Sequence, residues 1–143
     1  MSIPQNAAQT ASDALSKFDT MVSEFDGARL QDEARIGTMV AGRSPEAEAE
    51  ITQYVNTLRR KLAQFGEFIP TANQLAAWGY PELSNHVSAW LNFIDQRAVG
   101  YTQWGVEVHK MIVNDQVLKQ RQAAIDEWRA SQEARNREFQ GRD

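Results

Sequence analysis

The chain has 143 residues, a formal net charge of −4 at pH 7 and no cysteine, which excludes disulfides, thiolate nucleophiles and cysteine-ligated zinc. No segment is strongly basic, so we expect no nucleic acid as a partner, because phosphate binding needs a concentrated positive field. The sequence offers neither an apolar run that could span a bilayer nor a classical secretory signal, so we expect a cytoplasmic protein and disfavour a membrane as partner. Export by a non-classical route stays open.

The first amphipathic segment covers about residues 5–41. Its apolar side chains follow steps of three and four residues and form one stripe, made of Leu15, Phe18, Val22 and Phe25. The stripe is interrupted near Gly27 and returns at Ile36. The spacing predicts one helix that either kinks near Gly27 or has a solvated polar middle.

The second segment begins after a clear turn signal. Gly42 suits the left-handed position that ends a helix, and Ser44 before a proline is a good N-cap. Apolar residues then recur at helical spacing and predict a helix over about residues 45–69. Pro70 interrupts it, and residues 71–78 can form about two further turns.

The third segment starts at Pro81, and its apolar residues follow a seven-residue register. Seven of the nine register positions are apolar, the full series being Leu83, Trp90, Arg97, Trp104, Met111, Leu118, Ile125, Gln132 and Phe139. A second apolar seam accompanies the first only over residues 83–118. A broad face of this kind predicts a helix that packs against two others, followed by a narrower stripe in residues 119–143.

Helix lengths and short loops together predict an all-α fold. Neighbouring helices joined by short loops run antiparallel, so residues 1–118 are expected to form an antiparallel three-helix bundle, with its third helix over residues 81–118. Residues 119–143 would continue as a long C-terminal helix that projects beyond the bundle.

Two aromatic residues, Trp78 and Tyr80, flank a glycine at the connection before the third helix. In one interpretation Trp78 and Leu75 seal the open end of the core while Tyr80 packs as a hydrophobic staple. In the other, the two rings form an exposed knob that docks into a partner.

The residues that could carry chemistry are few. His86 and His109 diverge too far around one helix to share a metal, and no nucleophile or phosphate-binding motif occurs, so we expect no catalytic residue, cofactor or metal. Arg97 occupies a core register position between two tryptophans. We expect it to fix helix register by pairing with an acid of the first helix, in the first place Asp32 and in the second Glu33. A polar ligand pocket at Arg97 is the alternative.

These patterns favour a non-enzymatic helical interaction or assembly protein, whose partner is another protein or a second copy of the chain in a homo-oligomer. Ile125, Trp128 and Phe139 share one side of the charged C-terminal helix and predict self-association or docking there, with Trp78 and Tyr80 as further partner-binding residues. A solvated end with incidental aromatics is the plainer interpretation. The alternative function is an exported helical-bundle effector or translocator-like protein that acts on a host partner or membrane. An enzyme with a pocket inside the bundle is a third class.

Overall fold

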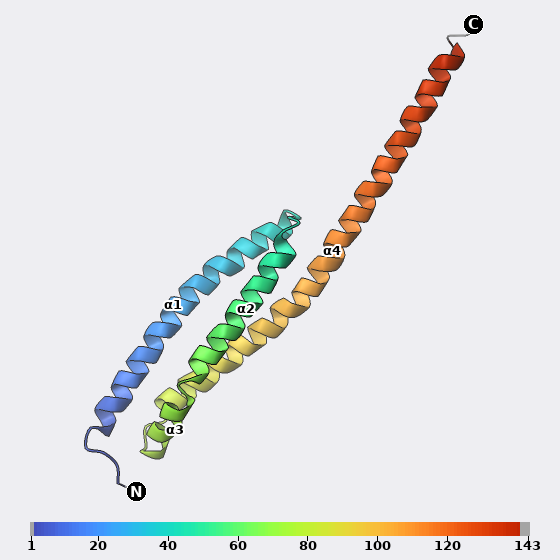
Figure 1. Cartoon of the computed structure of the whole chain (residues 1–143). Helices are drawn as coiled ribbons and strands as arrows, with labels where there is room; N and C mark the ends of the chain where they lie inside the picture. The colour runs from blue at the N-terminus through green and yellow to red at the C-terminus, as the bar shows by residue number, and fades with distance from the viewer. Residues whose placement is uncertain (1, 141–143) are drawn as a thin grey trace. The chain divides into compact units, whose positions relative to one another are not determined.

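A computed structural model describes residues 2–140, and every regular element among them is a helix (Figure 1). The elements are α1 (Ala7–Ala41), α2 (Ala47–Gly66), α3 (Ile69–Ala77) and α4 (Glu82–Gln140). The predicted all-α class and the long C-terminal helix are confirmed. The number of helices is four, because the second predicted segment is divided into α2 and α3.

Helix α1 runs through Gly27 without a break, and its polar middle is partly buried. Arg29, which follows the interruption of the apolar stripe, is only 9% exposed. A buried guanidinium needs partners, and Arg29 has two carboxylates of its own helix beside it, those of Asp26 and Glu33. A fully solvated middle, one of the two alternatives that the spacing leaves open, is therefore wrong, because Arg29 is an ion-paired part of the interior.

The turn between α1 and α2 differs in detail from the expected one. Gly42 has a φ of −82°, and the left-handed residue is Arg43, with a φ of 57°. Left-handed geometry is uncommon for a residue with a side chain. Here the backbone N–H groups of Arg43 and Ser44 donate hydrogen bonds to carbonyls in the last turn of α1. The Ser44 hydroxyl accepts a bond from the backbone N–H of Glu46, at 3.3 Å, just before α2 begins.

The break between α2 and α3 falls at Glu67 and Phe68, before the position expected from Pro70. Pro70 lies inside the first turn of α3. A proline is tolerated there because the first backbone N–H groups of a helix have no acceptor within the helix. The proline therefore marks the start of a helix and not the end of one.

The chain divides into two compact units, Met1–Val106 and Glu107–Asp143, where the sequence predicts a bundle boundary near residue 118. In the first unit, α1 and α2 lie side by side (Figure 1). Its interior contains fully buried side chains from all four helices, among them Phe18, Leu58, Phe65, Leu75 and Ile94. Phe18 meets Phe65 and Phe68 edge to face, and Phe25 does the same with Phe65 and Trp90. These contacts give the unit a continuous aromatic core.

Across residues 2–140, none of the helices has an apolar stretch of the length that a bilayer crossing needs.

Two glycines inside α4 provide a matched test of packing in the first unit. A Cβ at Gly105 would lie 3.2 Å from Cγ2 of Ile51, whereas a Cβ at Gly100 would meet nothing within 4 Å. Gly100→Ala should raise the free energy of unfolding by about 0.5–1 kcal/mol, because alanine removes the entropic cost of a helical glycine. Gly105→Ala should raise the free energy of unfolding less, or lower it, because the Ile51 side chain must move. Urea unfolding followed by circular dichroism would measure both, and a larger gain at Gly105 would contradict the packing.

Candidate functional site

The loop between α3 and α4 contains both aromatics that the sequence singled out. Leu75 is buried, while Trp78 and Tyr80 are half-buried on either side of Gly79, which has a φ of +95°. The backbone N–H of Tyr80 donates to the carbonyl of Leu75 at 2.9 Å and closes the turn. The loop is thus well ordered by its own hydrogen bonds, and both rings keep part of their surface in solvent.

Two open depressions flank this loop. One, of about 300 Å³, is lined by Trp78 together with Thr10, Pro70, Thr71, Gln74 and Leu75. The other, of about 230 Å³, has Tyr80 and Leu83 on one side and the first two turns of α1 on the other. Both are mainly apolar and shallow, which suits contact with a protein side chain better than enclosure of a small molecule.

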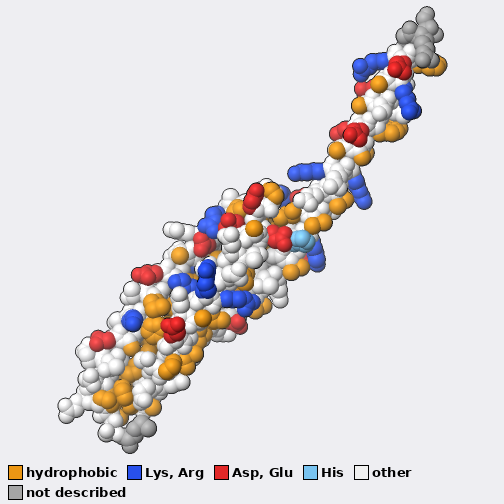
Figure 2. Space-filling view, in the orientation of Figure 1, with side chains coloured by type: hydrophobic (Ala, Val, Ile, Leu, Met, Phe, Trp, Pro, Cys, Tyr) orange, Lys and Arg blue, Asp and Glu red, His pale blue; other side chains and the backbone are white. Residues whose placement is uncertain are grey.

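The second unit carries the remaining predicted binding residues, all exposed. Ile125 is 44% exposed, Trp128 63% and Phe139 78%. Figure 2 shows hydrophobic side chains at the surface of this part of α4, between charged ones. Leu118, which the sequence assigned to the packed face, is 52% exposed and precedes Ile125 by one register step. It adds a fourth large apolar side chain to the same side of the helix.

A polar cluster in the first unit brings three helices to one carboxylate, that of Glu33. Arg97 of α4 donates to both of its oxygens, with Nε 3.2 Å from Oε2. The Tyr54 hydroxyl of α2 also donates to Oε2. Arg29, one turn before Glu33 in α1, donates to the same oxygen at 3.2 Å. The acid beside Arg97 is therefore Glu33. Asp32 pairs with Arg35 instead, at 3.0 Å.

An aromatic ring supports the two guanidinium groups of the cluster. The Cζ atoms of Arg29 and Arg97 lie 5.0 and 5.3 Å from the centre of the Phe93 ring. Arg29 also donates two hydrogen bonds to Oδ1 of Asp26, at 2.7 and 2.9 Å. The side chain of Glu33 is 12% exposed and that of Arg97 is 40% exposed. Arg97 thus stacks on Phe93 and reaches solvent at its far edge.

The electrostatics of the cluster favour an ionised Glu33. Burial by itself would raise the pKa of the Glu33 carboxyl, but hydrogen bonds from Arg97, Tyr54 and Arg29 outweigh it, and the pKa lies below its ordinary value. Burial, followed by the hydrogen bond to the Glu33 carboxylate, raises the pKa of Tyr54 far above its ordinary value. Burial and the same negative charge raise the pKa of Tyr101.

This arrangement has little capacity for acid–base chemistry. A carboxylate with three donors and a lowered pKa is a weak base, and the Tyr54 proton is firmly held. Within residues 2–140 no buried side-chain nitrogen or oxygen lacks a hydrogen-bond partner. The adjoining hollow, lined in part by Glu24, Arg29, Tyr54 and Lys61, has a volume of only about 100 Å³. It is too small for an ordinary metabolite.

The histidines do not form a metal centre with other ligands in the part of the chain that the structure describes, where no three potential ligand side chains converge. Nδ1 of His86 lies 3.3 Å from Oδ1 of Asp19 on α1. Both side chains are about half exposed, so this contact is a surface link between α1 and α4.

Comparisons of the chain with protein-family models, curated proteins and solved structures give no match.

Substitutions in the Glu33 cluster should have graded effects on stability. Arg97→Met should change the free energy of unfolding by less than about 1 kcal/mol, because Glu33 keeps Arg29 and Tyr54 and the methionine still covers Phe93. Arg97→Ala should lower the free energy of unfolding further, because alanine no longer covers the Phe93 ring. Glu33→Ala should cost about 2–3 kcal/mol, because it deprives the buried Arg29 and the Tyr54 hydroxyl of their acceptor. Chemical denaturation would rank the three variants, and equal, negligible effects would show that the cluster does not contribute.

The lowered pKa of Glu33 gives a pH dependence of definite sign. The folded-state pKa lies below the ordinary value of 4.5, so the contribution to stability is complete above about pH 4.5 and is lost as the pH falls through the folded-state pKa. Thermal unfolding between about pH 6 and pH 3 should show a steeper loss for the wild-type chain than for Glu33→Gln, which has no carboxyl to protonate. Parallel curves for the two proteins would contradict the assignment.

Proposed function

We propose that this chain is a non-enzymatic helical interaction or assembly protein that uses the C-terminal part of α4 for self-association or for docking onto a protein partner. The observation that carries the proposal is that four of the large apolar side chains exposed in the second unit are aligned on one side of the helix: Leu118, Ile125, Trp128 and Phe139. Val113 and Val117 of the same unit are exposed as well. Single exposed apolar residues are ordinary, whereas an aligned set that includes tryptophan and phenylalanine is typical of a binding face.

The alignment of the set follows from helical spacing. Ile125 is seven residues after Leu118, Phe139 is fourteen residues after Ile125, and Trp128 is three residues after Ile125. Each of these steps returns to nearly the same direction around a helix with 3.6 residues per turn. The four side chains therefore form one stripe, as in a helix that lies in an apolar groove or in half of a coiled-coil seam.

The stability of the segment also favours a bound state. Residues 119–143 carry six positive and five negative side chains, and the large apolar ones among residues 119–140 are Ile125, Trp128 and Phe139. A helix of this length is only marginally stable by itself in water, and packing of an apolar face is the usual source of its stability. Binding through the stripe would provide that packing.

For the first unit we propose the antiparallel three-helix bundle that the sequence predicts. Several contacts support it. In two of the three helix pairs, contacts made further along one helix involve earlier residues of the other, which is the pattern of antiparallel neighbours. Between α1 and α2 the contacts are Phe18 with Phe65, Glu33 with Tyr54 and Arg35 with Glu50. Between α2 and α4 they are Tyr54 with Tyr101 and Ile51 beside Gly105. Between α1 and α4 both numbers rise together, through Asp19 with His86, Phe25 with Trp90 and Glu33 with Arg97.

The absence of enzymatic activity is part of the same proposal. It is supported by the saturated hydrogen bonds around Glu33 and by the small volume of the hollow beside Arg29. The half-buried Trp78 and Tyr80 are proposed as a second contact surface, because the depressions beside them are shallow and mainly apolar.

The double substitution Trp128→Ala with Phe139→Ala tests the proposed function. It should abolish self-association or partner capture, because it removes the two largest apolar anchors, while thermal unfolding of the first unit stays unchanged. Light scattering coupled to size-exclusion chromatography and a pull-down with the full chain would give the first result, and circular dichroism the second.

A matched control removes two exposed apolar side chains from the first unit, Leu30→Ala with Val99→Ala. This control should leave association intact. If the Trp128 and Phe139 variant instead unfolds at a lower temperature than the wild-type chain, the two aromatics belong to a core and the proposal fails.

A further inference from the structure

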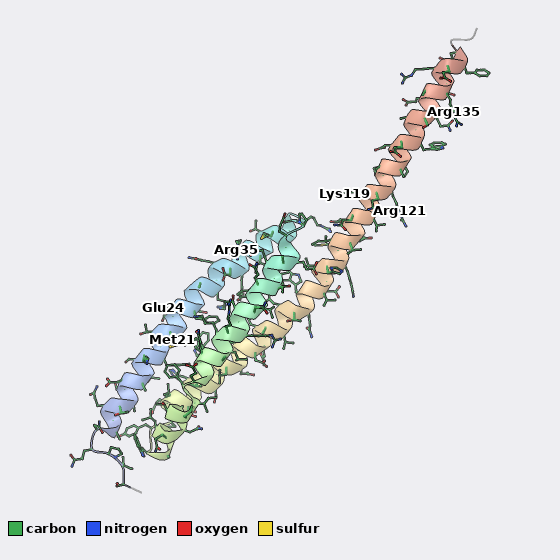
Figure 3. The ribbon with its side chains drawn as sticks, viewed as in Figure 1. Met21, Glu24, Arg35, Lys119, Arg121 and Arg135 are labelled. Atoms are coloured by element: carbon green, nitrogen blue, oxygen red, sulfur yellow. The ribbon has the colours of Figure 1, made fainter. Side chains whose placement is uncertain are left out.

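The apolar stripe of the second unit is interrupted and bordered by arginines. Arg121 lies three residues after Leu118 and four before Ile125. Arg135 lies seven residues after Trp128 and four before Phe139. Both are labelled in Figure 3, where they belong to the stretch of α4 that carries the stripe. At 3.6 residues per turn, these two and Arg129 all lie within about 60° of the centre of the stripe.

The acidic residues of the same segment lie elsewhere around the helix. Within residues 119–140, the part of the segment that the structure describes, all of them are about 100° or more from the centre of the stripe, the set being Asp126, Glu127, Glu133 and Glu138. Some have contacts on that side already, since Gln122 donates to Asp126 at 3.0 Å and Arg137 pairs with Glu133 at 3.6 Å. Nowhere in residues 2–140 does Arg121 or Arg135 have a hydrogen bond or ion pair. The binding face is therefore apolar and positive, and the opposite face is mostly acidic.

Pairing of this face with its own copy is unfavourable. In a parallel pair Arg121 would face Arg121, and in an antiparallel pair centred on Trp128 it would face Arg135. In other registers the guanidinium groups would enter an apolar seam without an acid, because the carboxylates lie on the far side. Like charges at a coiled-coil seam disfavour that pairing and select a partner of opposite charge.

A lipid surface is also a poor match for this face. Helices that lie on membranes have their basic residues on the polar face and a continuous apolar face opposite. Here the arginines are on the apolar face itself, and residues 119–143 have only one more positive than negative side chain. The attraction to anionic lipid, which grows with each net positive charge, is therefore small.

We propose that the stripe formed by Leu118, Ile125, Trp128 and Phe139 docks into an apolar groove of a different protein, and that carboxylates on the rim of that groove pair with Arg121, Arg129 and Arg135. This proposal depends on the proposed function and names the chemistry of its partner. Arginine suits the role because its planar guanidinium forms two parallel hydrogen bonds with one carboxylate. The residues that contribute most binding energy at protein interfaces are also enriched in tryptophan and arginine.

A pair of designed peptides provides the probe. Both are 28-residue coiled-coil helices with leucine at the two seam positions of each heptad; one has glutamate and the other lysine at the positions that flank the seam. The full chain, titrated against each dye-labelled peptide and followed by fluorescence anisotropy, should bind the glutamate peptide at least about tenfold more tightly than the lysine peptide. This preference should shrink as salt rises from about 50 to about 500 mM.

Charge-matched variants of the chain locate the effect. Arg121→Gln with Arg135→Gln should weaken binding of the glutamate peptide by about tenfold or more. Lys119→Gln with Arg137→Gln removes the same charge from the opposite side of the helix and should leave affinity within about twofold. Equal losses in the two double variants would show that only net charge matters, and would overturn the proposal.

The other occupants of the face give distinct results. If the wild-type chain is a dimer by light scattering and Arg121→Gln with Arg135→Gln strengthens the dimer, the face pairs with itself; the proposed function then stands and this inference fails. If the chain floats with vesicles of phosphatidylserine and phosphatidylcholine and binds neither peptide, the occupant is a membrane and the inference fails. If the chain stays monomeric and binds neither peptides nor vesicles, the proposed function fails as well.

Discussion

The Glu33 carboxylate is the interaction on which the first unit depends. It is the one group that accepts hydrogen bonds from α1, α2 and α4 together among the residues described, through Arg29, Tyr54 and Arg97. A shift of any of these helices by one turn, about 5.4 Å, would separate a buried charge from its partners. The apolar core alone imposes no such condition, because Leu, Ile and Phe contacts re-form in neighbouring registers with modest loss. We therefore propose that the cluster sets the alignment of the three helices.

Part of this cluster could be predicted from the sequence. Arg97 breaks a seven-residue apolar register between two tryptophans, and a charge at such a position needs an acid from a neighbouring helix. Asp32 and Glu33 were candidates because they lie where the apolar stripe of the first segment is interrupted. Arg29 escaped prediction because its partners lie three and four residues away on its own helix. That spacing is also what a solvated surface would have.

The local errors have local physical causes. Pro70 was interpreted as a helix end, although the first turn of a helix accepts proline equally well, and the sequence pattern around it does not distinguish the two. Gly42 was assigned the left-handed residue on the preference of glycine for it, but that conformation falls on Arg43. Leu118 was assigned to the packed face because seven-residue periodicity is the same for a packed and an exposed stripe. Periodicity indicates which residues share a face; it contains no information on what covers that face.

Arginines lie on the apolar side of α4 in both units, but their surroundings differ. In the first unit Arg97 has Glu33 and the Phe93 ring beside it, so its charge is compensated inside the fold. In the second unit Arg121 and Arg135 occupy the apolar side, and the acids of residues 119–140 lie on the other side. A charge left uncompensated at an apolar surface costs little while water reaches it and much once that surface is covered, unless the covering molecule brings a carboxylate. We propose that the same residue type fixes helix register where its acid is built in, and selects a partner where the acid must come from outside.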